Sequence, residues 1–129
     1  MKLEYFADGN LDCPLILLYG VEPECIKLLQ VELNKLIQGQ ISQLFIHDLP
    51  GFISVNNCQL FVSAGKRDIG VRNLAAANQF ECILQVETLQ QVIELLDPFA
   101  TNPENDGVRF QYLDDSGPIA WLISRARSW

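Results

Sequence analysis

The clearest hydrophobic pattern in the chain lies between Pro23 and Gln38. Placed at about 100° per residue, its apolar side chains fall on one side of a helix. A proline at the first position and Gly39 after the last suit the start and the end of such a helix. The apolar side predicts contact with a core, and its members are Ile26, Leu29, Leu33, Leu36 and Ile37, with Cys25 at the edge.

A second segment with helical spacing begins at Thr88. Thr88 and Gln91 have the spacing of a capping box, in which two side chains satisfy backbone N–H groups at a helix start. Pro98 is expected to end this helix, and residues 98–107 are expected to form a polar, acidic loop. The core-facing positions are Leu89, Val92, Ile93 and Leu96.

Several apolar stretches predict strands. Residues Leu15 to Tyr19 are apolar at every position, which is typical of a strand covered on both faces. Leu44 to Asp48 follows the first helix closely, and this order predicts a right-handed crossover that joins two parallel neighbours. Leu3 to Ala7 is a short strand candidate, and Phe80 to Val86 alternates between apolar and polar side chains as a half-buried strand does.

Two hairpins are expected. Residues 52–55 and 58–63 flank Asn56-Asn57, and asparagine tolerates the positive φ that a two-residue turn requires. The second hairpin starts at Val108, turns through the four residues 114–117 and returns from Pro118. Trp129 is expected either to pack on its own domain or to anchor a partner.

Together these elements predict the α+β class. We expect a single domain over residues 1–129, with a mixed, largely antiparallel sheet of about six to seven strands and two main helices packed on one face. If no part of the chain covers the other face of the sheet, that face is the place for a partner.

Composition narrows the range of functions. The formal net charge of −7 repels phosphate backbones, so no nucleic-acid partner is expected. The longest apolar run is too short to span a bilayer, and the first residues lack the pattern of a signal peptide. We therefore expect no membrane association and a cytoplasmic location, where the four cysteines stay reduced. With no C-x-x-C and one histidine, neither a metal site nor a cofactor is expected.

The segment 65–79 has no clean period and is predicted to be a loop, with one helical turn at residues 74–77. Its first part combines two glycines with the only cluster of positive charge in the middle of the chain. Such charges can hold a carboxylate or a phosphate, but the spacing matches neither glycine-rich nucleotide-binding motif. The candidate ligand- or partner-binding residues are Lys66, Arg67, Asp68 and Arg72, and the alternative is a solvated turn with local charge pairs.

No complete catalytic motif is present. His47 beside Asp48 is the nearest approach to a general base, with Cys58 or Ser54 as a hypothetical nucleophile. Adjacent residues of a strand point to opposite faces, however, which disfavours a dyad of His47 and Asp48. We therefore predict no catalytic residues, and whether the protein is an enzyme stays open.

On the first helix, Leu28 and Val31 lie opposite the core-facing side. They are either half-exposed surface side chains or a second contact, such as a homodimer face. The favoured interpretation is a small cytosolic binding or regulatory module that is non-catalytic and acts through contacts with a protein partner or with a second copy. The alternative is a binding protein or enzyme for a small anionic molecule, with its site around residues 65–72.

Overall fold

The computed structural model describes residues 1–101 and 108–129, and it contains two β-sheets. The strands of the first sheet are β1 (Lys2–Phe6), β2 (Leu15–Tyr19), β4 (Ile53–Ser54), β8 (Phe110–Asp114) and β9 (Ala120–Ser124). They form a five-stranded sheet in the order β4-β1-β2-β9-β8. β1 is antiparallel to β2, and β8 is antiparallel to β9. β2 and β9, in the middle of the sheet, run parallel.

The second sheet has four strands in the order β3-β5-β7-β6. They are β3 (Leu44–Phe45), β5 (Gln59–Ala64), β6 (Gly70–Asn73) and β7 (Gln79–Leu84). The two central strands, β5 and β7, run parallel, and each edge strand is antiparallel to its neighbour. Alternate residues of the central strands face inward and are buried, as the period of a half-buried strand requires.

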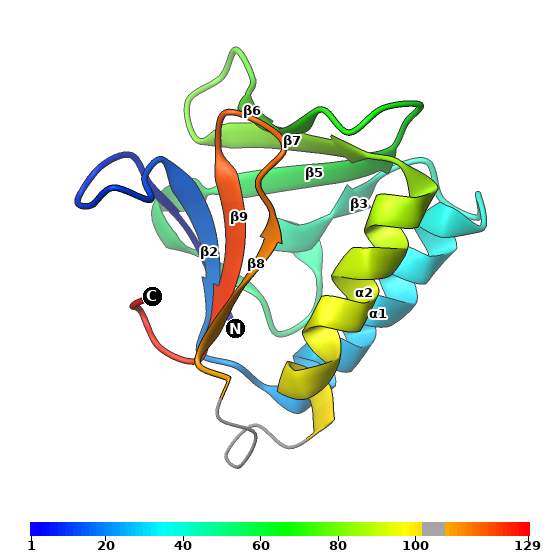
Figure 1. Cartoon of the computed structure of the whole chain (residues 1–129), viewed down its shortest axis with the longest axis horizontal. Helices are drawn as coiled ribbons and strands as arrows, with labels where there is room; N and C mark the ends of the chain where they lie inside the picture. Colours follow the sequence, from blue (N-terminus) through cyan, green and yellow to red (C-terminus); the bar gives the residue numbers. More distant parts are fainter. Residues whose placement is uncertain (102–107) are drawn as a thin grey trace.

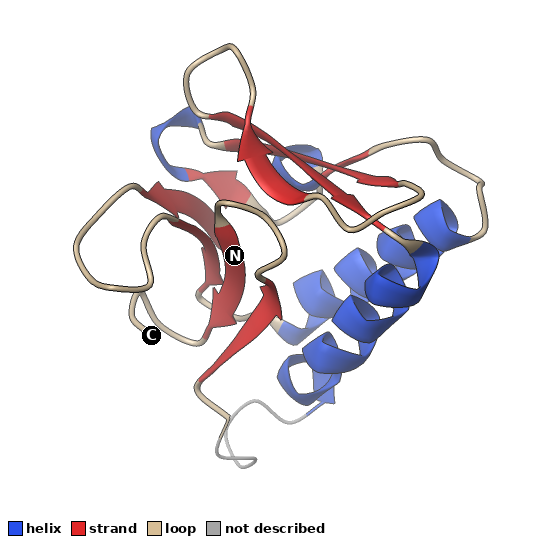
Figure 2. Ribbon diagram, turned by 45° about the horizontal axis from the view of Figure 1, so that its top comes forward, coloured by secondary structure: helices blue, strands red, loops and turns tan. Residues whose placement is uncertain are grey.

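Two helices, α1 (Pro23–Ile37) and α2 (Val86–Thr101), lie side by side and form the third side of a common core (Figures 1 and 2). The Gln30 side chain joins them, because its Nε2 donates to the Ile93 carbonyl and to Asp97 Oδ1. Buried apolar side chains from both sheets and both helices form one cluster. Neither helix in the described part of the chain has the length and apolar character of a membrane-spanning segment.

Both predicted helices are present. All the core-facing positions predicted for α1 are buried apart from Ile37, which is half-buried. The predicted bounds of α2 are wrong, because the helix begins at Val86 and continues through Pro98 to Thr101. Phe99 and Ala100 are buried beyond the proline, so packing outweighs one lost backbone hydrogen bond. Residues 102–107 of the expected loop lie outside the described residues.

The α+β class is confirmed, with the strands divided between sheets of five and four. The predicted crossover is wrong, because β2 and β3 belong to different sheets. β2 has β9 as its parallel neighbour, whereas β3 is a short edge strand antiparallel to β5. After β3 the chain leaves the sheet in a 3-10 turn, η1 (Ile46–Asp48). Thus α1 leads from the five-stranded to the four-stranded sheet, and α2 leads back.

The predicted hairpin around Asn56-Asn57 is also wrong. Both asparagines have the expected positive φ, 53° and 56°, but they belong to a 3-10 turn, η2 (Val55–Asn57). The strand before this turn, β4, pairs with β1 in one sheet, and the strand after it, β5, lies in the other. The asparagines therefore carry the chain between sheets.

The segment 65–79, expected to be a loop, contains the edge strand β6, and residues 74–77 form a bend and turn without a helix. Only Gly70 and Val71 of this strand are buried, so its sequence lacks an apolar alternation. The second hairpin is confirmed by the antiparallel pair β8 and β9. Its turn is held by Asp114, whose carboxylate accepts hydrogen bonds from the Ser116 N–H and hydroxyl.

The two sheets meet where β6 touches this turn. Gly70 has a φ of +76°, and a Cβ added to it would lie 2.2 Å from the Gly117 backbone nitrogen. Next to this contact, the Ile119 N–H donates to the Val71 carbonyl at 3.3 Å. Only glycine permits both the left-handed backbone and this close approach.

We expect Gly70→Ala to lower the free energy of unfolding by about 3 kcal/mol, because it combines a strained φ with a collision against backbone. Gly39→Ala is the matched control, since Gly39 also has a positive φ, +72°, but open space around its Cβ position. That variant should lose only about 1 kcal/mol. Urea denaturation measures both, and equal losses would contradict the role given to the contact between the sheets.

Candidate functional site

The outer face of the five-stranded sheet is covered by the chain itself. Residues 125–129 follow β9 and turn back beside the sheet (Figure 1). A second buried cluster lies here, formed by Leu15, Leu17, Tyr19 and Leu122. Trp129 packs against this cluster, so the expectation that it packs on its own domain is confirmed.

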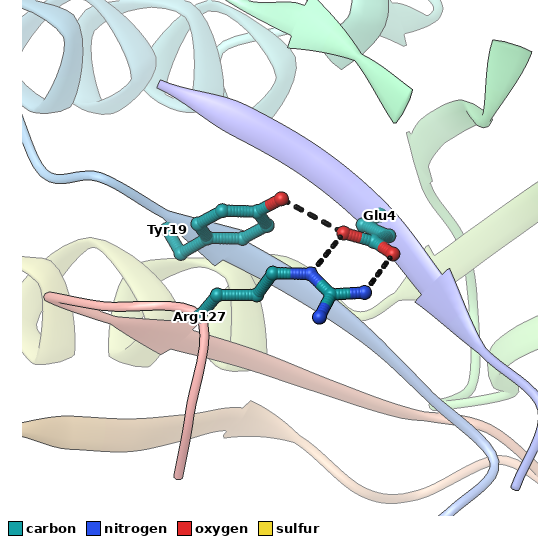
Figure 3. A network of polar contacts seen from close by, with 3 residues as sticks. All are labelled: Glu4, Tyr19 and Arg127. Carbon is teal, nitrogen blue, oxygen red and sulfur yellow. Dashed lines mark hydrogen bonds and ion pairs between the residues drawn. The ribbon is translucent and has the colours of Figure 1, made fainter. Parts of the chain in front are cut away.

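Arg127 fixes this segment through a buried carboxylate (Figure 3). Its Nε donates to Glu4 Oε1 at 3.0 Å, and its Nη2 donates to Oε2 at 2.9 Å. The Tyr19 hydroxyl donates to the same Oε1 at 2.8 Å. The hydrogen bonds from Arg127 lower the pKa of the Glu4 carboxyl, against the opposing effect of its burial. Burial, together with the hydrogen bond to Glu4, raises the pKa of Tyr19.

Two further contacts hold the end of the segment. The rings of Trp129 and Phe6 meet edge to face, with centroids 5.1 Å apart. The indole Nε1 donates to Asp12 Oδ2 at 3.2 Å, and the Tyr112 hydroxyl donates to Asp12 Oδ1 at 2.8 Å. The segment is therefore bound to β1 and to the loop before β2, and Tyr112 of β8 binds the same Asp12.

The outer face of the four-stranded sheet differs from that of the five-stranded sheet, because it carries aromatic side chains that are exposed or half-buried. Phe45 on β3 is 40% exposed, and Phe61 beside it on β5 is half-buried, with ring centroids 5.3 Å apart. By register, Phe61 lies opposite Glu81 on β7, and Glu81 lies opposite Arg72 on β6. We call this row, Phe45-Phe61-Glu81-Arg72, together with the half-buried Ile83, the sheet face. Its Arg72 and Glu81 form an ion pair.

His47 and Cys58 are each held in an arrangement that does not suit catalysis. The Nδ1 of His47 accepts a hydrogen bond from the Leu60 N–H at 3.1 Å, and its ring lies edge to face with Phe61. Its Nε2 lies 3.8 Å from Asp48 Oδ2, beyond hydrogen-bond distance. Burial raises the pKa of the Cys58 thiol to about 12, so this thiol is protonated and a poor nucleophile.

The structure separates the four candidate residues of the segment 65–72. Lys66 and Arg67 are exposed. The Asp68 carboxylate accepts from the Gln85 N–H and from the Thr88 hydroxyl, both at 2.8 Å, at the start of α2. Arg72 pairs with Glu81 on the sheet face. Two of the four side chains thus hold the fold together locally, and a ligand site here stays a prediction.

The candidate dimer face on α1 consists of one exposed and one half-buried side chain. Val31 is 54% exposed, and Leu28 beside it is half-buried. Exposed and charged residues, among them Lys27 and Glu24, occupy much of the same helix surface. Scattered apolar side chains of this kind are common on surfaces, and the dimer face on α1 stays a prediction.

A hollow of about 430 Å³ lies where the start of β8 meets the end of β9, and we call it the end hollow. No sequence motif indicated it, because its residues come from two strand ends and from the segment after β9. Among the described residues, no group of three or more histidine, cysteine or acidic side chains is arranged to hold a metal ion. The end hollow is lined by Arg109, Phe110, Ser124, Arg125, Ala126, Ser128 and Trp129.

In comparisons with known proteins, no protein family, curated protein or solved structure matches the chain. Function must therefore be inferred from the side chains and surfaces described above.

We expect Glu4→Gln to lower the free energy of unfolding at neutral pH by about 1–2 kcal/mol, since it weakens hydrogen bonds between charged groups in a partly exposed pair. Folding lowers the pKa of Glu4, so this stabilisation is present above the ordinary carboxyl pKa and is lost as the pH falls through the lowered value. The difference between variant and parent should thus shrink between neutral pH and a strongly acidic pH. Glu24→Gln, the same charge change at an exposed position, should leave stability nearly unchanged at both pH values.

We expect Asp68→Ala to lower the free energy of unfolding by about 1 kcal/mol, because the start of α2 loses the carboxylate that accepts from its backbone and from Thr88. Lys66→Ala, two residues away and exposed, serves as the control and should change stability by less than about 0.5 kcal/mol. Thermal unfolding followed by circular dichroism measures both. If the two variants unfold alike, Asp68 does not stabilise α2.

Proposed function

We propose that this protein is a non-catalytic binding module that acts through protein–protein contacts, with the sheet face as its contact surface and a second copy of the chain as its partner. The observation that carries the proposal is the difference between the two sheets. Side chains that include Phe6, Tyr112 and Trp129 pack over the outer face of the five-stranded sheet, whereas Phe45 on the other outer face is 40% exposed. Within the described residues, the His47 ring packs edge to face with Phe61 and Gly65 lies close to Ile83, while Phe45 and Arg72 stay exposed.

The charge of the sheet face supports a second copy as partner. The chain as a whole carries a formal charge of −7, so two copies repel each other over most of their surfaces. On the sheet face the charged side chains are Arg72 and Glu81, which neutralise each other in an ion pair. Two copies that meet by this face avoid the repulsion between acidic surfaces.

The row across the sheet also suits a two-fold arrangement, in which the same patch of each copy contacts the other. Its aromatic half, Phe45 and Phe61, lies on β3 and β5, and its charged half lies on β7 and β6. A two-fold axis parallel to the strands places the Arg72 of one copy against the aromatic rings of the other. Guanidinium groups pack favourably on aromatic faces.

The candidate catalytic side chains of the sequence are held in arrangements that favour a binding role over catalysis. His47 is bound through Nδ1 to the backbone of β5, and Cys58 is a buried, protonated thiol. The alternative function, an anionic-ligand site at residues 65–72, has less support because Asp68 and Arg72 already bind within the chain.

We expect the parent protein to have twice its chain mass of 14.6 kDa at high micromolar concentration and Phe45→Glu to be monomeric, because a carboxylate would be buried against the partner. Val31→Glu is the matched control, since it places the same charge on an exposed apolar position of α1. Size-exclusion chromatography with light scattering measures the masses.

A dimer in Val31→Glu together with a monomer in Phe45→Glu supports the sheet face. The reverse pattern moves the interface to Leu28 and Val31 on α1. A parent protein that stays monomeric at high micromolar concentration contradicts self-association altogether.

A further inference from the structure

The end hollow is a concave site that lies apart from the sheet face, on the five-stranded sheet. Its volume of about 430 Å³ falls within the range of about 300–1,000 Å³ found for small-molecule sites. Phe110 and Ser124, which face each other across β8 and β9, contribute to its lining. The remaining lining comes from Arg109 before β8 and from the residues after β9.

The lining is basic in a protein that is acidic overall. The chain has 16 acidic and nine basic residues, yet the described residues that line the hollow include two arginines and no aspartate or glutamate. Arg109 is exposed, and its guanidinium makes no hydrogen bond or ion pair with any described residue. Its donors are therefore available to an anion, and the planar guanidinium group matches a carboxylate in a bidentate pair.

Two aromatic residues line the same hollow. Phe110 is 43% exposed, a large fraction for an aromatic side chain, and Trp129 contributes its indole ring. Aromatic walls pack against flat apolar groups, and a few polar groups fix the orientation of a ligand. The combination suits a molecule with a flat ring at one end and a carboxylate at the other.

Contacts within the chain hold the lining residues of the end hollow in place without a ligand. Trp129 is fixed by the Phe6 ring and by Asp12. Arg125 donates through Nε to the Val108 carbonyl at 2.6 Å and lies over the Phe99 ring at 4.8 Å. The Ser124 hydroxyl is bonded to the Ser128 carbonyl, which closes the segment against β9. A preformed site loses little entropy when it binds.

We propose that the end hollow binds a small aromatic carboxylate, with the Arg109 guanidinium on the carboxylate and the rings of Phe110 and Trp129 against the aromatic part. This site goes beyond the proposed contact between two copies, because it lies on the other sheet and takes a different class of ligand.

Titration with cinnamate, followed by two-dimensional ¹H–¹⁵N NMR, tests the proposal. The chain has two tryptophans, and Trp129→Phe assigns their indole signals. Cinnamate should shift the Trp129 indole signal in a saturable way and leave that of Trp121 unchanged, because Trp121 is fully buried in the main core. Cinnamamide, which lacks the charge, and acetate, which lacks the ring, should each bind at least about tenfold more weakly.

Arg109→Gln should raise the dissociation constant for cinnamate about tenfold or more, and Arg109→Lys should restore part of the affinity because it keeps the charge. Arg67→Gln is the matched control, the same change at an exposed arginine of the segment 65–72. It should alter the constant by less than about twofold.

Any of the following results would overturn the proposal: no saturable shift of the Trp129 signal, equal binding of cinnamate and cinnamamide, or an equal loss of affinity in Arg67→Gln and Arg109→Gln. A loss confined to Arg67→Gln would also overturn it and would favour the segment 65–72 as the anion site. None of these results depends on the oligomeric state, because the light-scattering experiment tests the sheet face separately.

Discussion

The close approach of Gly70 to Gly117 joins the two sheets that enclose the common core. At this point the edge strand β6 and the turn before β9 touch backbone to backbone, and Val71 and Ile119 share a hydrogen bond. Neither sheet has a complete core of its own, since each buries its inner face against the other sheet and the helix pair. Both helices connect one sheet to the other, so the three sides must form together.

Because the core has three sides, each sheet has an outer face that points away from it. The two outer faces differ in how far other parts of the chain pack on them. The outer positions of β2 are the apolar Leu15, Leu17 and Tyr19. The side chains packed on them include Trp129, from the segment 125–129, and also Phe6, Cys13 and Tyr112. The buried Glu4 carboxylate binds Arg127 of the segment 125–129, so this segment is an integral part of the fold. The outer positions of β5 and β7 mix aromatic, amide and charged side chains, a composition that tolerates water and also suits a partner.

Local patterns in the sequence predicted both helices and several strands, but they did not predict which strands pair across the fold. The period of α1, the unbroken apolar run of β2 and the hairpin of β8 and β9 each depend on neighbouring residues. The assignment of β2 and β3 to different sheets depends on contacts distant in sequence, which a period does not encode. β6 was missed because an edge strand with two buried residues has no alternation. The end hollow was missed for a related reason, since Trp129 is positioned by Phe6 and Asp12 from the other end of the chain.

The arginines show why a cluster of charge in a sequence is weak grounds for a binding site. Arg72 belongs to the densest basic segment, yet it is paired with Glu81, and its neighbour Asp68 stabilises the start of α2. Arg109 stands outside that segment, but it lies on the wall of a hollow whose described lining residues include aromatic side chains and no aspartate or glutamate. What a charged side chain can bind depends on whether the fold already uses its hydrogen bonds and whether the surface around it is concave. By both criteria Arg109 is better placed to bind a ligand than Arg72, although the sequence favours Arg72.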